Sequence, residues 1–219
     1  MKNYKKNLEL LTKNHVYSKE MEHDACGVGL IASTEGKKSR AIVEYGIEAL
    51  KAVWHRGAVD ADGKTGDGAG IHVEIPKDFF IEKIEVTGHD YDNSEICVGM
   101  IFLPRNDYSA QENCKTIVES ELTKNNFSIY GWRQVPVNPK VLGEKALQTM
   151  PEIIQVLFKS NDPNLLDKNL ERKIYETRKR IENKAFDASL NNFYICSISS
   201  KSIIYKGLYL AEAISDFYL

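Results

Sequence analysis

The sequence has no excess of charge of either sign and no long hydrophobic run. Its formal net charge at pH 7 is −2, from 29 basic and 31 acidic residues. A basic surface for nucleic acid or for an anionic membrane is therefore not predicted. No apolar stretch approaches the roughly 18 residues that a membrane-spanning helix needs. The apolar content of 42% is that of an ordinary globular protein, with no nucleic-acid or membrane partner implied.

Cysteine is scarce, and the four cysteines are not spaced for metal or redox chemistry. No two of them form a C-x-x-C motif. Cys97 and Cys196 lie in apolar, strand-like runs and Cys114 lies in a helical pattern, which favours buried structural thiols. None has the spacing of an iron–sulfur ligand, and no metal site is predicted. Cys26 differs in its neighbours. Charged residues precede it, and Gly27-Val28-Gly29 follows it at the start of an apolar run.

The first 25 residues lack the features of a targeting signal. They are rich in lysine but have no apolar core with a small-residue cleavage site, and they contain acids that transit peptides avoid. Weak helical periodicity surrounds Leu8, Leu10 and Leu11. We interpret residues 1–25 as a leader, not a domain, and expect a cytoplasmic protein.

From Cys26 onward, strand and helix patterns follow one another without internal repeats. Strands are expected at 26–33, 70–76, 96–104, 127–137 and 152–160, with two short strands, arranged as a hairpin or separately, in 193–207. Helices are expected at 39–56, with Ser39 as its cap, and at 76–84, 108–126 and 167–184. Residues 57–70 form a loop rich in glycine and aspartate. Some of these strands are almost entirely apolar, and others alternate apolar with polar residues. This mixture predicts sheets that lie between layers of helices.

Cys26 can be activated in two ways. A thiol attacks as its thiolate and needs a base, usually a histidine. His55 and His72 are long-range candidates, whereas His23 lies on the leader. Alternatively, cleavage between Ala25 and Cys26 would place an α-amine on the nucleophilic residue itself. The pKa of such an amine, about 7.7–8.0 in model peptides, suits a base at neutral pH. The residues alone leave both possibilities open.

Three stretches resemble a known family when taken together. They are CGVGLIAS at 26–33, HRGA at 55–58 followed by ADGKTGDGAG at 61–70, and YKGLYLAEAISDFY at 205–218. From Cys26 to the end, the chain resembles the glutaminase domain of the glutamate synthase large subunit, a class II glutamine amidotransferase. The resemblance implies an α+β fold, the four-layer αββα sandwich of N-terminal-nucleophile (Ntn) hydrolases, incomplete in this chain.

The resemblance also implies roles for individual residues. Residues 1–25 would be a propeptide cut between Ala25 and Cys26, and 26–219 the N-terminal portion of the amidotransferase domain. Cys26 would be the nucleophile, with its α-amine as base, and would release ammonia from glutamine through a glutamyl thioester. Gly27 would allow close approach to it, and Arg56 would favour its thiolate. Gly29 has the same expected role as Gly27.

Further expectations concern the rest of such a synthase. Ammonia would pass to 2-oxoglutarate at a distant site that uses FMN and an iron–sulfur cluster, with no cofactor in this segment. The partners would be glutamine, the remainder of the synthase subunit and a reductase subunit. In the family, the glutamine anchors and an Asn-Gly oxyanion pair lie beyond Leu219, and no Asn-Gly occurs here. The substrate-binding residues of this chain are therefore unassigned, with Thr65 and Asp67 as the loop side chains that could touch substrate or propeptide.

Two alternatives follow from the same residues. The chain could be a truncated, inactive fragment with an assembly or binding role, since losing one oxyanion donor alone costs roughly 10²–10³ in rate. It could also be another class II amidotransferase, such as the purine-pathway enzyme, although the 61–70 loop resembles glutamate synthase in particular.

Overall fold

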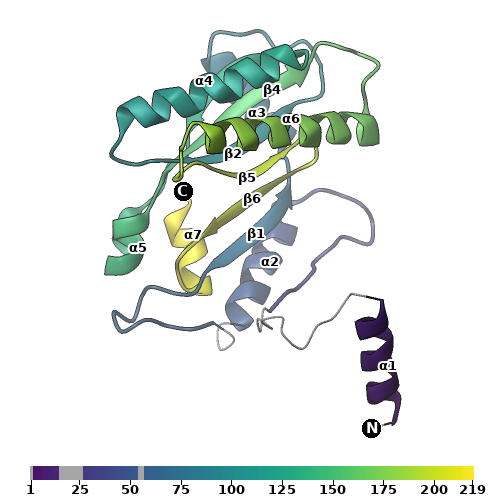
Figure 1. Ribbon diagram of the computed structural model, residues 1–219, viewed down its shortest axis with the longest axis vertical. Helices are drawn as coiled ribbons and strands as arrows, with labels where there is room; N and C mark the ends of the chain where they lie inside the picture. The colour runs from purple at the N-terminus through teal and green to yellow at the C-terminus, as the bar shows by residue number, and fades with distance from the viewer. Residues whose placement is uncertain (1, 15–26, 54–56) are drawn as a thin grey trace.

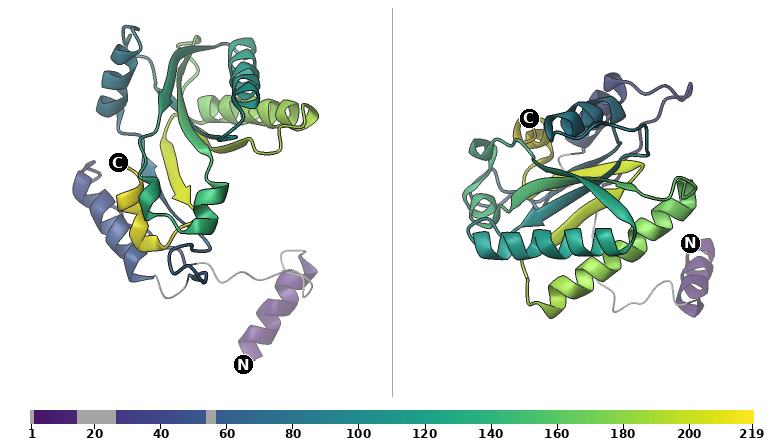
Figure 2. Two further views of the ribbon diagram at one scale, coloured as in Figure 1. Left: turned by 90° about the vertical axis from the view of Figure 1, so that its left-hand side faces the viewer. Right: turned by 90° about the horizontal axis from the view of Figure 1, so that it is seen from above.

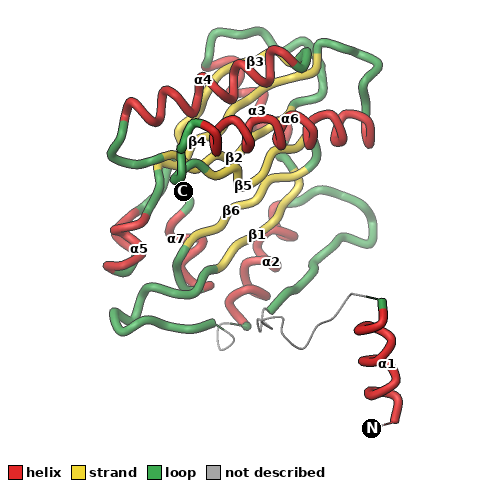
Figure 3. Tube along the Cα trace, viewed as in Figure 1, coloured by secondary structure: helices red, strands yellow, loops and turns green. Residues whose placement is uncertain are grey.

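The computed structural model describes residues 2–14, 27–53 and 57–219 (Figures 1 and 3). The helices are α1 (Lys2–Lys13), α2 (Arg40–Ala52), α3 (Lys77–Val86), α4 (Tyr108–Lys124), α5 (Glu144–Thr149), α6 (Asp167–Asp187) and α7 (Ile214–Phe217), with short 3-10 turns η2 (Pro139–Val141) and η3 (Ala211–Ala213). The strands are β1 (Ala69–Glu74), β2 (Cys97–Leu103), β3 (Phe127–Gln134), β4 (Glu152–Ser160), β5 (Tyr194–Ser199) and β6 (Ser202–Gly207).

The strands form two antiparallel sheets stacked between helices. One sheet has the order β3-β4-β2-β5, and the other pairs β1 with β6. Helices α4 and α6 cover one face of the four-stranded sheet, β1 and β6 lie against its other face, and α2 packs beyond β1 (Figures 1 and 2). The resulting layers, helix–sheet–sheet–helix, confirm the predicted α+β class and its αββα succession.

The central strands β2 and β4 are apolar on both faces because each face meets a different core. On β2, Val98 and Met100 face the space between the sheets, whereas Cys97 and Ile101 face α4 and α6. A strand alternates its side chains between faces, so two buried faces require a continuous apolar run. Such runs were the basis for predicting buried strands at 96–104 and 152–160, and both predictions are confirmed.

The outer core lies between the four-stranded sheet and helices α4 and α6. Cys114, Val118 and Leu122 recur every four residues on α4 and are fully buried. Asp107 caps this helix, accepting a hydrogen bond from the Ala110 amide at 2.9 Å. The matching stripe on α6 consists of Leu170, Ile174, Thr177, Ile181 and Ala185. Both predicted helices are therefore amphipathic and pack by these stripes.

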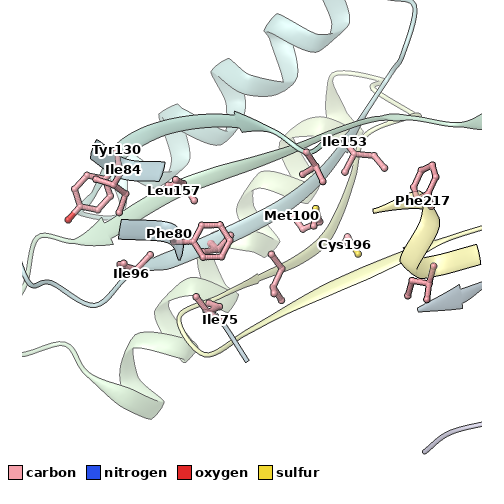
Figure 4. Packing of buried hydrophobic residues seen from close by; sticks show 14 of the residues in the cluster. Ile75, Phe80, Ile84, Ile96, Met100, Tyr130, Ile153, Leu157, Cys196 and Phe217 are labelled. Carbon is pink, nitrogen blue, oxygen red and sulfur yellow. The ribbon is translucent and has the colours of Figure 1, made fainter. Parts of the chain in front are cut away.

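The inner core lies between the two sheets and is closed at one end by α3. Phe80 and Ile84 of α3 pack with Ile96, Met100 and Leu157 (Figure 4). Toward the other end the same cluster continues through Ile153, Cys196 and Phe217 (Figure 4). This core fixes how the small sheet sits against the large one.

One expectation on the N-terminal side of the domain is wrong, and another is confirmed in position only. Residues 27–33 form no strand, and Val28 and Leu30 are 93% and 89% exposed. An apolar, alternating pattern becomes a strand only when another strand supplies hydrogen-bond partners, and this segment has none among the described residues. Ser39 occupies the N-cap position of α2, yet its side chain makes no capping hydrogen bond.

The two strands expected in 193–207 are present but do not pair as a hairpin. β5 hydrogen-bonds to β2, and β6 to β1, so a single turn carries the chain from one sheet to the other. Glu171 of α6 fixes that turn, accepting hydrogen bonds from the Ser200 amide at 2.7 Å and the Ser200 hydroxyl at 2.8 Å. Side chains replace the missing ladder: the Ile204 amide donates to the Ser197 hydroxyl at 3.1 Å.

Among the residues that the structure describes, no helix is both long enough and apolar enough to cross a bilayer.

Candidate active-site cleft

A cleft of about 1820 Å³ opens at the end of the two sheets. One wall consists of Gly27, the end of α2, the loop residues 57–58 and 67–68, and the start of β1. A second wall consists of residues 102–107, residues 146 and 148–149 of α5, and the segment 191–194. The end of β6 and residues 208–212 line its floor. The cleft thus gathers the three stretches on which the family resemblance rests, through residues 27, 57–58, 67–70 and 206–212.

The predicted catalytic residues are sequence neighbours of residues that line this cleft. Ala25 and Cys26, and likewise His55 and Arg56, lie outside the described residues. Their neighbours do not: Gly27, which follows Cys26, lines the cleft, as do residues 57 and 58, which follow Arg56. The catalytic roles of Cys26 and Arg56 therefore stay predictions.

The glycines beside the nucleophile differ from one another in what the structure shows. Gly27 is exposed on the cleft wall. At Gly29, a Cβ would meet no atom of the described residues within 4 Å. The close approach expected at Gly27 and Gly29 stays a prediction.

The three remaining cysteines are unsuited to nucleophilic chemistry. Cys97 and Cys114 are fully buried and Cys196 is 5% exposed. Burial raises the pKa of Cys114 and of Cys196 to about 11, and raises the pKa of Cys97 well beyond the ordinary thiol range. Thiols in such surroundings stay protonated at neutral pH. The prediction that these three are structural is confirmed, which leaves Cys26 as the candidate nucleophile.

The loop from Gly57 to Gly68 is folded back on itself. An isolated bridge joins Val59 to Gly66, and the Asp67 amide donates to the Ala58 carbonyl at 3.3 Å. This fold buries Thr65, which is 7% exposed, and leaves Asp67 exposed in the cleft lining. Of the two loop side chains considered for substrate contact, only Asp67 faces the cleft.

Several polar residues line the cleft although nothing in the sequence predicted that they would. Lys206 donates a hydrogen bond to the Tyr194 hydroxyl at 2.7 Å, and its ammonium lies 4.5 Å from the Tyr194 ring centroid. Arg105 follows β2 and reaches the Leu147 carbonyl at 3.5 Å. Each stands at the end of a strand, and only the sheet topology brings these ends to one place. His72, one of the two histidines considered as a base, is exposed on the cleft wall.

Tyr209 is the most deeply buried polar side chain of the cleft floor. It is 1% exposed, and its hydroxyl has no hydrogen-bond partner among the described residues. Burial raises the pKa of this phenol far above its ordinary range. Tyr209 is therefore a neutral donor at any physiological pH, not a base.

Within the described residues, no three side chains of histidine, cysteine, aspartate or glutamate come together as metal ligands would. Cys97, Cys114 and Cys196 are separately buried, so these residues do not fit an iron–sulfur cluster.

Comparison with known proteins decides the family. The model of the class-II glutamine amidotransferases matches residues 26–219. The chain belongs to this family. Its layered sheets are accordingly those of an Ntn hydrolase.

This amidotransferase is similar to proteins named as glutamate synthases. It is 52% identical to "Glutamate synthase [NADPH] large chain" of Azospirillum brasilense over 98% of the chain, which is 14% of that relative. It is 40% identical to "Ferredoxin-dependent glutamate synthase 1, chloroplastic/mitochondrial" of Arabidopsis thaliana over 90% of the chain and 12% of the relative. The chain thus spans about one seventh or less of the curated relatives it matches.

Proposed function

We propose that the chain supplies the glutamine-hydrolysing site of a glutamate synthase. The observation that carries this proposal is the 52% identity with a glutamate synthase large chain over 98% of the residues. The cleft supports it, because the stretches that resemble the synthase line one cavity that begins at Gly27. The purine-pathway alternative lacks this support, since the relatives named here are glutamate synthases.

In the proposed mechanism, cleavage after Ala25 frees the α-amine of Cys26. The amine takes the thiol proton, and the thiolate attacks the side-chain amide of glutamine. The protonated amine gives this proton to the leaving nitrogen, so that the tetrahedral intermediate expels ammonia and leaves a glutamyl thioester, which water then hydrolyses to glutamate. Arg56, as the family resemblance implies, would favour the thiolate electrostatically. Residues 57–58 and 67–68 line the cleft in which these steps are proposed to occur.

The ammonia is proposed to serve 2-oxoglutarate at a second site in the remainder of the synthase subunit. FMN and an iron–sulfur cluster belong to that remainder, which would supply the reducing chemistry. The electron donor is left open, because the relatives include an NADPH-named and several ferredoxin-named synthases. A reductase subunit as partner and a cytoplasmic location are parts of the same proposal.

Labelling with a glutamine-analogue electrophile, such as a diazoketone, tests the proposal. The natural polypeptide that carries this chain should take up one equivalent, at Cys26, and its intact mass should lack residues 1–25. In a Cys26→Ala variant, we expect labelling to vanish and glutamine-dependent activity to fall on the order of 10⁴-fold or more, while ammonia-dependent synthesis persists.

Two results would refute the proposal. One is full glutamine-dependent activity with Met1–Ala25 retained, which excludes the amine as base. The other is full activity in Cys26→Ala, which excludes the nucleophile. The competing idea of an inactive fragment is tested on residues 1–219 alone, where stoichiometric labelling of Cys26 would exclude it.

A further inference from the structure

Helix α5 has a glycine at its N-cap position, and a side chain from a distant loop caps its first turn instead. Gly143 holds the N-cap position and offers no side chain to the first amides of the helix. The Ala146 amide, three residues on, donates instead to the Thr65 hydroxyl at 3.4 Å. Thr65 is thereby placed as the side chain of an N-cap residue would be, although it lies far away in the sequence.

Asp62 holds Thr65 in that place. Its carboxylate accepts from the Thr65 hydroxyl at 2.5 Å, from the Thr65 amide at 2.7 Å and from the Lys64 amide at 2.9 Å. These bonds, led by that from the Thr65 hydroxyl, hold the pKa of the Asp62 carboxyl well below its usual range. The carboxylate is thus ionised at any physiological pH and keeps the Thr65 hydroxyl oriented.

The space at Gly143 is filled by these two side chains. A Cβ added to Gly143 would lie 2.3 Å from Asp62 Oδ2 and 2.3 Å from Thr65 Oγ1. No side chain at this position fits without displacing the loop. The glycine and the loop are therefore complementary, and we call Asp62, Thr65 and Gly143 the clasp.

The clasp joins two walls of the cleft. On one side, the loop that contains Asp62 and Thr65 continues into Asp67 and Gly68, which line the cleft. On the other side, α5 contributes Ala146 and residues 148–149 to the lining. The loop also packs closely against the backbone at Tyr209. A Cβ at Gly66 would lie 2.6 Å from the Tyr209 carbonyl oxygen.

We propose that Asp62 and Thr65 are positioning residues, which cap α5 from the loop and thereby set the separation of the two cleft walls. The inference rests on the proposed glutamine hydrolysis for its kinetic consequence. Neither side chain has a catalytic role, because the Thr65 hydroxyl is committed to Asp62 and Ala146. Small displacements of positioning groups cost catalysis steeply, about 10²-fold for 1 Å.

The test compares two reagents that reach Cys26 in the full natural polypeptide. A glutamine-analogue electrophile needs both cleft walls, whereas iodoacetamide needs only the thiolate. In Thr65→Val and Gly143→Ala, we expect the ratio of the two labelling rates to fall about 10- to 100-fold. Thr65→Ser keeps the hydroxyl and should restore the ratio to within about threefold of wild type. Lys64→Ala, an exposed change in the same loop, is the matched control and should leave the ratio unchanged.

Hydrogen exchange separates this inference from the proposed function. In Thr65→Val, the amides of α5 should lose protection while β2 and β4 keep theirs, whether or not glutamine is the substrate. Wild type that fails to react with the glutamine analogue would refute the proposed function alone. Unchanged α5 protection in Thr65→Val, or an unchanged labelling ratio in both Thr65→Val and Gly143→Ala, would overturn the clasp. A fall of the labelling ratio in Thr65→Ser as large as that in Thr65→Val would also overturn the clasp.

Discussion

The half of the molecule built on α4, α6 and the four-stranded sheet differs in kind from the half around the cleft. In the first, which we call the helical half, long apolar stripes meet in a dry core with side chains such as Leu122 and Phe158 fully buried. In the second, the cleft half, α2 has no fully buried residue, and the 57–70 loop is held by hydrogen bonds and glycines.

This difference shows how the two halves divide the work. Burial of apolar surface is non-directional and tolerates small shifts, so it serves stability. Hydrogen bonds to a carboxylate such as Asp62 fix distance and direction, so they serve geometry. We therefore expect damage to the helical half to reduce the free energy of unfolding, and damage to the cleft half to reduce activity first.

The largest expected effect on stability comes from Leu122→Ala in the helical half. Leu122 is fully buried on α4, and removing its side chain should reduce the free energy of unfolding by about 2–5 kcal/mol. Leu208→Ala is the matched change in the cleft half, where Leu208 is 50% exposed, and should cost within about 0.5 kcal/mol. Urea unfolding followed by circular dichroism measures both. Equal losses at the two sites would abolish the contrast.

An intermediate effect is expected from Glu171→Gln, because Glu171 links the two halves. Its carboxylate accepts from Ser199 and from both the amide and the hydroxyl of Ser200, which is 2% exposed. Replacing it leaves buried donors poorly matched and should cost about 1–3 kcal/mol in the same unfolding assay. Glu176→Gln on the exposed face of α6 removes only an ion pair with Arg172 and should cost within about 0.5 kcal/mol. A loss at Glu171 no larger than at Glu176 would show that the turn needs no anchor.

The smallest effect at neutral pH concerns the buried thiols. In a Cys26→Ala variant at pH 8, Cys97, Cys114 and Cys196 should resist a thiol reagent until denaturant exposes all three. Because the folded state keeps the Cys114 and Cys196 protons up to a pKa of about 11, stability should be flat below the ordinary thiol pKa of about 8.5 and fall above it. Thiol counting and unfolding midpoints from pH 7 to 10.5 measure both. Rapid labelling of the folded variant at pH 8 would contradict the dry core.

The helical half could be predicted from the sequence because its signals are local. The continuous apolar run around Val98 predicted a buried strand, and residues 167–184 were predicted to form a helix; both predictions are confirmed. The structural role of Cys114 followed from its place in such a stripe.

The cleft half could be predicted only in part, because its structure depends on residues far apart in the chain. The apolar pattern of residues 27–33 predicted a strand, yet a strand needs a partner that the pattern does not name. The burial of Thr65 in a polar loop follows from Asp62 and from Gly143, and only the D-x-x-T spacing was available as a local signal of a turn. The division of β5 and β6 between two sheets has no local signal at all.

The small sheet has a consequence for the order of assembly. Among the described residues, its ladder runs from the pair Ala69–Gly207 to the pair Glu74–Ser202. The two strands are separated in the chain by all four strands of the large sheet. Closing so long a loop is entropically costly unless intervening structure has already drawn its ends together. During synthesis this side of the cleft can therefore form only after the ribosome has released β6, the second strand of that ladder.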